Sequence, residues 1–207
     1  GIYTGYKYYE TRYADTVLGQ GNAGAAAGSS TGEAWTYQNE VTYPFGYGLS
    51  YTTFEQKLEN VEVNLNERTV AADGTVKNTG NTAGKDAVQL YVSVPYTDYD
   101  REHLVEKSVI QLLDYGKTEE LKPGESTTVT ITADAQDMTS WDSTSKNEAG
   151  TEGNYILDAG DYFFTVGDDA HHAMNNVLAA QSRSEANGMT EAGDASNVKT
   201  WNLASID

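Results

Sequence analysis

The chain has 207 residues, which is enough for one domain of ordinary size with extra elements, or for two small domains. Its 31 acidic and 13 basic side chains give a net charge of −18, which repels phosphate backbones and anionic lipid heads and so argues against nucleic-acid and membrane-surface partners. The absence of cysteine excludes a disulfide scaffold and a thiolate metal site, and it fits a bacterial cytoplasm and a secreted location equally well.

The first 54 residues contain two aromatic stretches separated by a segment of small residues. Residues 1–13 hold five tyrosines together with Ile2 and Thr4, a composition that favours a strand. Residues 15–39 are rich in Gly, Ala, Ser and Thr, which predicts a long loop without the Gly-Lys-Ser/Thr ending of a phosphate-binding loop. Residues 43–54 read YPFGYGLSYTTF, and we expect a tightly turned connector whose aromatic side chains are buried on a core.

Short strands with alternating apolar and polar residues are expected between residues 58 and 166. Val61, Val63 and Leu65 alternate with polar residues, and the alternation recurs at residues 88–94, 127–131 and 162–166. In residues 88–94 the positions of Gln89, Tyr91 and Ser93 are expected to face outward. About seven strands with turn signals at regular spacing predict a mainly β fold, a β-sandwich of the fibronectin type III or immunoglobulin kind. Gly74 predicts a bent or partly unpaired second strand, since glycine weakens strands.

The C-terminal 40 residues differ from the strands before them. Residues 170–181 place Met174, Val177 and Leu178 at helical spacing after two aspartates, which predicts a short helix. Residues 182–207 are polar and weakly patterned, which indicates a connector leading out of the domain.

Several segments in order resemble glycoside hydrolase family 3. They are residues 1–10 (GIYTGYKYYE), 43–54 (YPFGYGLSYTTF), 76–80 (VKNTG), 84–92 (GKDAVQLYV), 121–126 (LKPGES) and 159–167 (AGDYFFTVG). Residues 168–180 (DDAHHAMNNVLAA) resemble the members in which the domain order is reversed and the barrel domain follows the fibronectin-like domain.

This resemblance implies a division of the chain and a role for it. It implies that residues 1–54 are the strand-and-loop tail of an α/β sandwich domain with its connector, residues 55–167 a fibronectin type III-like β-sandwich, and residues 168–207 a helix and linker toward a missing domain. It also implies that the parent is a retaining β-glucosidase, whose two catalytic carboxyl groups lie about 5–5.5 Å apart. The family's nucleophile and acid/base motifs do not occur in this chain, so no catalytic residue is predicted here.

The expected partners are the catalytic barrel and α/β domains of the parent enzyme, and the candidate sugar contacts are Tyr96, Tyr99 and Trp141 in or beside loops of the sandwich. No cofactor or metal is expected, because adjacent His171 and His172 point about 100° apart on a helix. Only the pair Asp168 and His172 has ligand spacing. Two hypotheses follow: a non-catalytic structural segment that stabilises the catalytic domains, or an independent β-sandwich module that binds carbohydrate or a cell surface.

Overall fold

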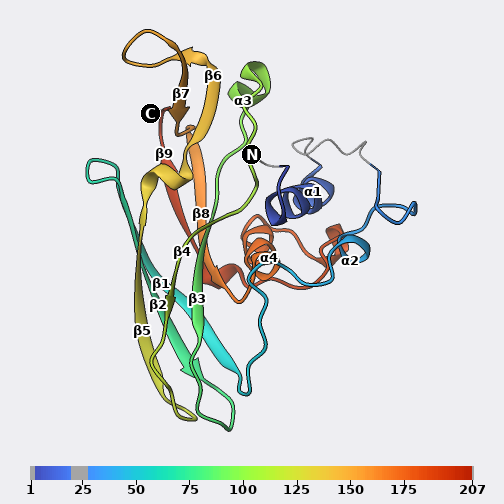
Figure 1. Ribbon diagram of the computed structural model, residues 1–207, viewed down its shortest axis with the longest axis vertical. Helices are drawn as coiled ribbons and strands as arrows, with labels where there is room; N and C mark the ends of the chain where they lie inside the picture. The colour runs from blue at the N-terminus through green and yellow to red at the C-terminus, as the bar shows by residue number, and fades with distance from the viewer. Residues whose placement is uncertain (1–2, 20–27, 207) are drawn as a thin grey trace.

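The computed structural model describes residues 3–19 and 28–206, which form a β-sandwich with a group of helices on one side (Figure 1). Ile2 and the glycine- and alanine-rich centre of the expected loop lie outside the described residues. Among the described residues, no helix is long and apolar enough to cross a membrane.

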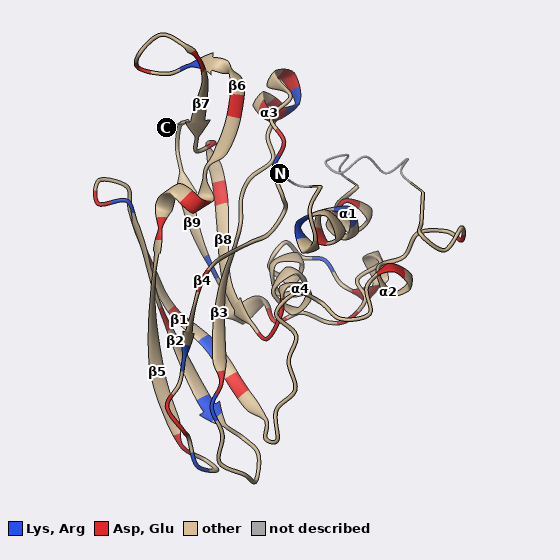
Figure 2. Ribbon diagram, viewed as in Figure 1, with Lys and Arg blue, Asp and Glu red and all other residues tan. Residues whose placement is uncertain are grey.

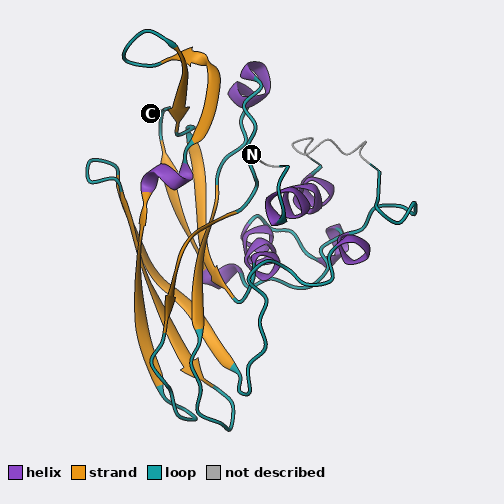
Figure 3. Cartoon of the chain, in the orientation of Figure 1, coloured by secondary structure: helices purple, strands orange, loops and turns teal. Residues whose placement is uncertain are grey.

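Two sheets face each other in the sandwich (Figure 3), and a separate hairpin extends from one end. The first sheet has the order β1-β2-β5, and the second has the order β4-β3-β8-β9, with each neighbouring pair antiparallel. The hairpin is β6-β7. The strands are β1 Phe54–Asn64, β2 Thr69–Asn78, β3 Ala87–Ser93, β4 Gln111–Lys117, β5 Ser126–Asp134, β6 Ser140–Lys146, β7 Glu152–Ile156, β8 Gly160–Gly167 and β9 Val198–Leu203.

The helices cluster beside the second sheet, except for α3 (Figure 1). They are α1 Tyr6–Leu18, α2 Tyr37–Glu40, α3 Asp98–His103 and α4 Ala170–Ala180, with short 3₁₀ turns η1 Ala135–Met138, η2 Glu185–Asn187 and η3 Ala195–Asn197. Helix α4 confirms the helix expected at residues 170–181, and Asp169 caps it by accepting a hydrogen bond from the backbone N–H of His172.

Apolar side chains form two cores. The first fills the space between the sheets, with Leu58, Val76, Leu90 and Phe164 fully buried there. The second lies between the helices and the outer face of the second sheet, and it includes Tyr13, Met174 and Tyr91. Strand β3 is therefore buried on both faces. The prediction that Gln89, Tyr91 and Ser93 face outward is wrong, because helices cover that face.

Residues 3–13, the described part of the predicted N-terminal strand, do not form a strand. Residues 6–18 form helix α1 instead, and Tyr6, Tyr13 and Val17 pack in the helical core at helical spacing. The helix ends at Gly19, whose φ of 71° is left-handed. Contact with α4 thus overrides the strand preference of tyrosine.

Two further expectations about strands need correction. Strand β2 is fully paired on both sides at Gly74, and the register shift lies opposite it, between Leu58 and Asn60 of β1. The C-terminal stretch predicted as a connector contains β9, which pairs with β8 from Val198 to Leu203. Hydrogen bonds to β8 stabilise β9 as a strand, although its own sequence alternates too weakly to predict one.

Candidate functional site

Residues 43–51, which we call the aromatic segment, lie mostly on the surface. Leu49 is 90% exposed and Tyr51 is 100% exposed, while Tyr43, Phe45 and Tyr47 are also exposed. The prediction of burial is therefore wrong for these side chains, while Phe54, the last aromatic residue of the predicted connector, packs against the sandwich core. Apolar surface gathered in one short stretch is typical of a contact with another protein surface.

The backbone of the aromatic segment is nonetheless anchored to the sandwich. The N–H of Ala170 donates to the carbonyl of Phe45 (2.8 Å), and the side-chain amide of Gln89 donates to the carbonyl of Gly46 (3.2 Å). The Phe45 ring stacks on Tyr6 at 4.3 Å. Gly46 has a φ of 90°, and a Cβ there would lie 2.0 Å from the Gln89 side-chain oxygen. The segment is exposed, yet its conformation is fixed.

Hollows lie on both sides of the aromatic segment. One of about 390 Å³ is lined by residues including Tyr6, Tyr9 and Tyr43. The other, of about 480 Å³, is lined by residues including Tyr47, Phe54 and Asp168. Because of these hollows, the surface around the aromatic segment is uneven rather than flat.

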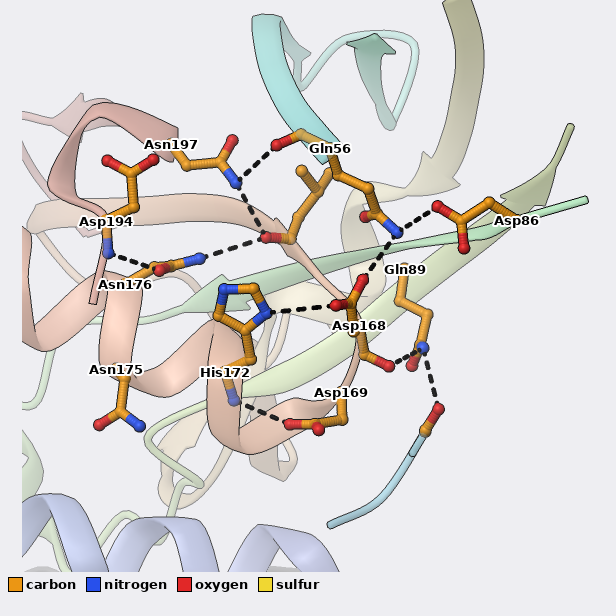
Figure 4. A network of polar contacts seen from close by, with 12 residues as sticks. Gln56, Asp86, Gln89, Asp168, Asp169, His172, Asn175, Asn176, Asp194 and Asn197 are labelled. Atoms are coloured by element: carbon orange, nitrogen blue, oxygen red, sulfur yellow. Dashed lines mark hydrogen bonds and ion pairs between the residues drawn. The ribbon is translucent and has the colours of Figure 1, made fainter. Parts of the chain in front are cut away.

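A network of polar contacts borders the second hollow (Figure 4). The side-chain amide of Gln56 donates to Asp86 (2.8 Å) and Asp168 (3.1 Å), and that of Gln89 donates to the backbone carbonyl of Asp168 (2.6 Å). Burial raises the pKa of both Asp86 and Asp168. His172 lies 3.9 Å from Asp168 at the spacing predicted from the sequence.

The same network continues to the C-terminal segment through buried asparagines. The N–H of Asp194 donates to Asn176 (2.7 Å), and the N–H of Leu58 donates to Asn197 (2.6 Å). Strand β1, helix α4 and residues 194–197 are joined in this way. Among residues 3–19 and 28–206, no group of three or more His, Asp or Glu side chains is placed to hold a metal ion.

His171 takes part in a second buried network, which we call the α1–α4 contact. Its Nδ1 lies 2.9 Å from Glu10, and its Nε2 lies 2.6 Å from the hydroxyl of Thr190. The hydroxyl of Tyr37 donates to Glu10, and the Tyr37 ring stacks on His171 at 3.7 Å. Burial raises the pKa of Glu10, although the contacts with His171 oppose this. The sequence signalled His171 only through its neighbouring histidine.

The order Glu10, His171, Thr190 matches the acid–imidazole–hydroxyl order of hydrolase triads, but its surroundings differ. Glu10 is completely buried, and Thr190 is held on other sides as well, because its backbone N–H donates to the Tyr13 hydroxyl and its hydroxyl accepts from the side-chain amide of Asn175. Neither His171 nor Thr190 lines the two hollows beside the aromatic segment. The arrangement holds α1, α4 and residues 185–191 together.

The three predicted sugar-contact residues all lie at one end of the sandwich, around α3 and the β6–β7 hairpin (Figure 1). Their side chains do not share one pocket. Tyr96 packs under Arg101, with the guanidinium carbon 4.8 Å from the ring centre. Trp141 is 50% exposed and lines a separate cleft. Whether any of them contacts sugar stays a prediction.

Tyr99 is occupied by a structural contact. Its ring stacks on His103 at 4.0 Å, and its hydroxyl donates to Asp142 (2.5 Å). Burial works against ionisation of Asp142, but hydrogen bonds from Tyr99 and Thr144 outweigh it and lower the pKa of Asp142 to about 2. The same hydrogen bond raises the pKa of Tyr99 to about 12. This contact fastens α3 to β6.

A buried charge cluster fastens the other side of α3. Lys107 forms ion pairs with Asp100 (2.8 Å) and Asp158, and all three side chains are almost completely buried. Thr97 and Asp100 form a capping box at the start of α3. Elsewhere the acidic residues are spread over strands, loops and helices (Figure 2), as expected for a surface that favours solubility.

The fold and the family comparison define the class of the protein as a fibronectin type III-like β-sandwich: residues 86–170 match the fibronectin type III-like domain family. The chain is 35% identical over 179 residues to β-glucosidase A of Butyrivibrio fibrisolvens, a match that covers 80% of this chain and 18% of that protein. It is 29% identical over 192 residues to an exo-α-(1→6)-L-arabinopyranosidase of Bifidobacterium breve, covering 92% of this chain and 20% of that protein.

A solved structure agrees with these matches. The β-glucosidase of Kluyveromyces marxianus superposes on this chain with a TM-score of 0.60 and 26% identity, covering all of this chain and 17% of that protein. The chain spans about a fifth or less of the length of these relatives. The chain is therefore similar to the segment of glycoside hydrolase family 3 enzymes that carries their fibronectin type III-like domain.

Proposed function

We propose that this chain is a non-catalytic structural segment of a retaining β-glucosidase, and that its aromatic segment packs against the catalytic barrel and α/β domains and stabilises them. The observation that carries the proposal is the exposure of Leu49 and Tyr51 on a backbone that is held in place between two hollows. Fixing an exposed apolar stretch in one conformation lowers the entropy lost when a partner covers it.

The length of the relatives supports the choice of partner. The matched β-glucosidase A is more than five times as long as the matched region, so most of such a protein lies outside this chain. As part of the proposal we keep the division into residues 1–54, 55–167 and 168–207. Pairing of β9 with β8 adds that the third stretch is attached to the sandwich before it leads toward a further domain.

The carboxylates that lie close together support a non-catalytic role. Asp86 and Asp168 both accept from the amide of Gln56, and Asp100 and Asp158 both pair with Lys107. A retaining mechanism needs one carboxylate free to attack the sugar and one acid free to protonate the leaving group. Side chains held by a shared donor serve to join elements of the fold.

The test compares the full-length parent protein with a double variant, Leu49→Ser and Tyr51→Ser. We expect its thermal unfolding midpoint to fall by several degrees and its half-life for hydrolysis of a chromogenic β-glucoside to shorten. The matched control is Leu104→Ser and Tyr115→Ser, which changes two exposed side chains outside the aromatic segment. The isolated chain should unfold within about 0.5 kcal/mol of wild type with either pair of changes.

Two results would contradict the proposal. One is a full-length double variant as stable and long-lived as its control, which would show that the aromatic segment contacts nothing important. The other is hydrolysis of the β-glucoside by the isolated chain, which would place catalytic groups within these residues.

A further inference from the structure

The structure contains a small cleft beside Trp141 that the proposed docking role does not use. It is lined by Lys7 of α1, Gln111 of β4, Asp137 of η1, Trp141 of β6 and residues including Glu106 of the loop after α3, and its volume is about 180 Å³. A cleft of this size fits a single ring with its substituents. Five separate parts of the fold build it, so its shape depends on the folded chain.

The polar side chains of the cleft are held in place by one another. The ammonium of Lys7 donates to the side-chain oxygen of Gln111 (2.9 Å), and the amide of Gln111 donates to the carbonyl of Asp137. The hydroxyl of Tyr3 donates to Glu106 (2.9 Å). An ammonium has three donors and a carboxylate has two acceptor oxygens, so these contacts leave capacity for a ligand.

Trp141 is exposed and yet well fixed. Its ring lies over Gly153, where a Cβ would come within 2.3 Å of the ring and where φ is 96°. The ring also packs edge-to-face with Tyr155 at 5.0 Å. Next along the strand, Asp142 is fixed by Tyr99. A half-exposed tryptophan that is already held by such contacts loses little entropy when a ligand covers it.

The chemistry of the lining selects the class of ligand. Two cations, Lys7 and Lys107, and two carboxylates, Glu106 and Asp137, line the cleft, and Lys107 is already paired with two buried aspartates. The charges balance, so neither a simple anion nor a simple cation is favoured. A neutral molecule with many hydroxyl groups can donate to Glu106 and Asp137 and accept from Lys7. Its C–H groups can pack on the negative face of an indole ring. We propose that this cleft binds a pyranose sugar, with Trp141, Lys7 and Asp137 as the contacting side chains.

This inference goes beyond the docking role and does not depend on it. It also narrows the sequence prediction: of Tyr96, Tyr99 and Trp141, only Trp141 lines the proposed site, while Tyr99 is hydrogen-bonded to Asp142 outside it. The sequence missed Lys7, Gln111 and Asp137, which lie far apart along the chain and carry no shared motif.

The test uses the whole 207-residue chain and titrates it with glucose, xylose and cellobiose. Intrinsic tryptophan fluorescence and the indole N–H signals in heteronuclear NMR spectra report binding. We expect saturable binding of at least one sugar with a Kd on the order of 1–10 mM. Trp141→Ala should weaken binding by at least about tenfold, and Asp137→Asn by about fivefold. The control Tyr115→Ala should bind as wild type does.

Circular dichroism and thermal unfolding identify a variant that fails to fold. If Trp141→Ala is unfolded, Asp137→Asn and Lys7→Met still decide the question, because both keep the hydrophobic core intact. The proposal is overturned if no sugar gives a saturable signal up to about 100 mM, far above the expected Kd. It is also overturned if binding survives in folded Trp141→Ala or falls equally in Tyr115→Ala. These measurements use this chain alone, so a negative result would not affect the proposal that the aromatic segment packs against the catalytic domains.

Discussion

The α1–α4 contact and the aromatic segment are both rich in aromatic residues and lie close together in the fold, but they differ in where those residues point. In the α1–α4 contact, Tyr13 and Tyr37 are buried against His171 and Glu10. In the aromatic segment, Tyr51 is fully exposed and Tyr43 is largely so.

The two regions differ in which of their polar groups need hydrogen-bond partners. The buried tyrosines bring hydroxyl groups into a core, and each hydroxyl has a hydrogen-bond partner: Tyr13 donates to Asn175 (2.6 Å), and Tyr37 to Glu10. In the aromatic segment, it is the backbone that is hydrogen-bonded, at Phe45 and Gly46, and the side chains are left outward. The first region stabilises this chain, and the second is the region proposed above to contact the rest of a parent enzyme.

The largest effect is expected from breaking the α1–α4 contact with His171→Ala. The change leaves the completely buried Glu10 without its imidazole partner and opens a cavity beside Tyr37. We expect a loss of about 3 kcal/mol in the free energy of unfolding of the isolated chain, measured by urea denaturation. The neighbouring His172→Ala is the matched control, since its side chain is 41% exposed, and it should cost little. Equal losses in the two variants would contradict the comparison.

The sequence predicted the sandwich well because alternation of apolar and polar residues is a local pattern with a strong physical cause. Strand Ala87–Ser93 and helix Ala170–Ala180 were both expected close to these bounds. The failures share another cause. Tyr13 is buried by Asn175 and His171, more than 150 residues away, and no local pattern contains that contact.

The aromatic segment and the cleft both show that sequence alone does not reveal which residues the fold brings together. Apolar composition at Leu49 and Tyr51 predicts burial but does not say whether the covering surface belongs to this chain. At the cleft, Trp141 was a candidate because it is an aromatic residue next to a predicted loop, and its contact with sugar stays a prediction. Its partners Lys7 and Gln111 were missed because the fold brings them together across 104 positions.

The second prediction tests whether the aromatic segment is truly held in one conformation. Gly46→Ala places a Cβ on a residue with φ of 90° and against the Gln89 side chain, which is itself held by Gly46, Asp168 and Tyr91. We expect a loss of about 2 kcal/mol in unfolding free energy, since the strain and the displaced hydrogen bonds act together.

Gly48→Ala provides the matched control for this change. Gly48 has nothing within 4 Å of an added Cβ and is not among the glycines with positive φ. Urea denaturation of both variants should show a loss only for Gly46→Ala. If both behave as wild type, the backbone of the aromatic segment adapts freely, and the contrast with the α1–α4 contact would then rest on exposure alone.

The smallest effect at any one pH is expected from Glu10→Gln, because an amide can keep both hydrogen bonds, accepting from Tyr37 and donating to His171. The groups that face Glu10 are His171, Tyr37 and, at longer range, Asp169. Burial raises the pKa of Glu10 above its ordinary value of 4.5. Its contribution to stability is therefore fully present below pH 4.5 and is lost as pH rises through the folded-state pKa.

The effect of Glu10→Gln should therefore be measured as a change in how the free energy of unfolding depends on pH. Between pH 4 and pH 7, the unfolding free energy of the wild type should fall relative to that of Glu10→Gln, with the two closest at the acid end. Urea denaturation at several pH values measures this difference, and Glu62→Gln, on the exposed side of β1, is the control that should run parallel to wild type. Parallel curves for Glu10→Gln would show that Glu10 keeps its charge at no cost in the folded chain. The α1–α4 contact would then be as tolerant of charge as the surface around the aromatic segment.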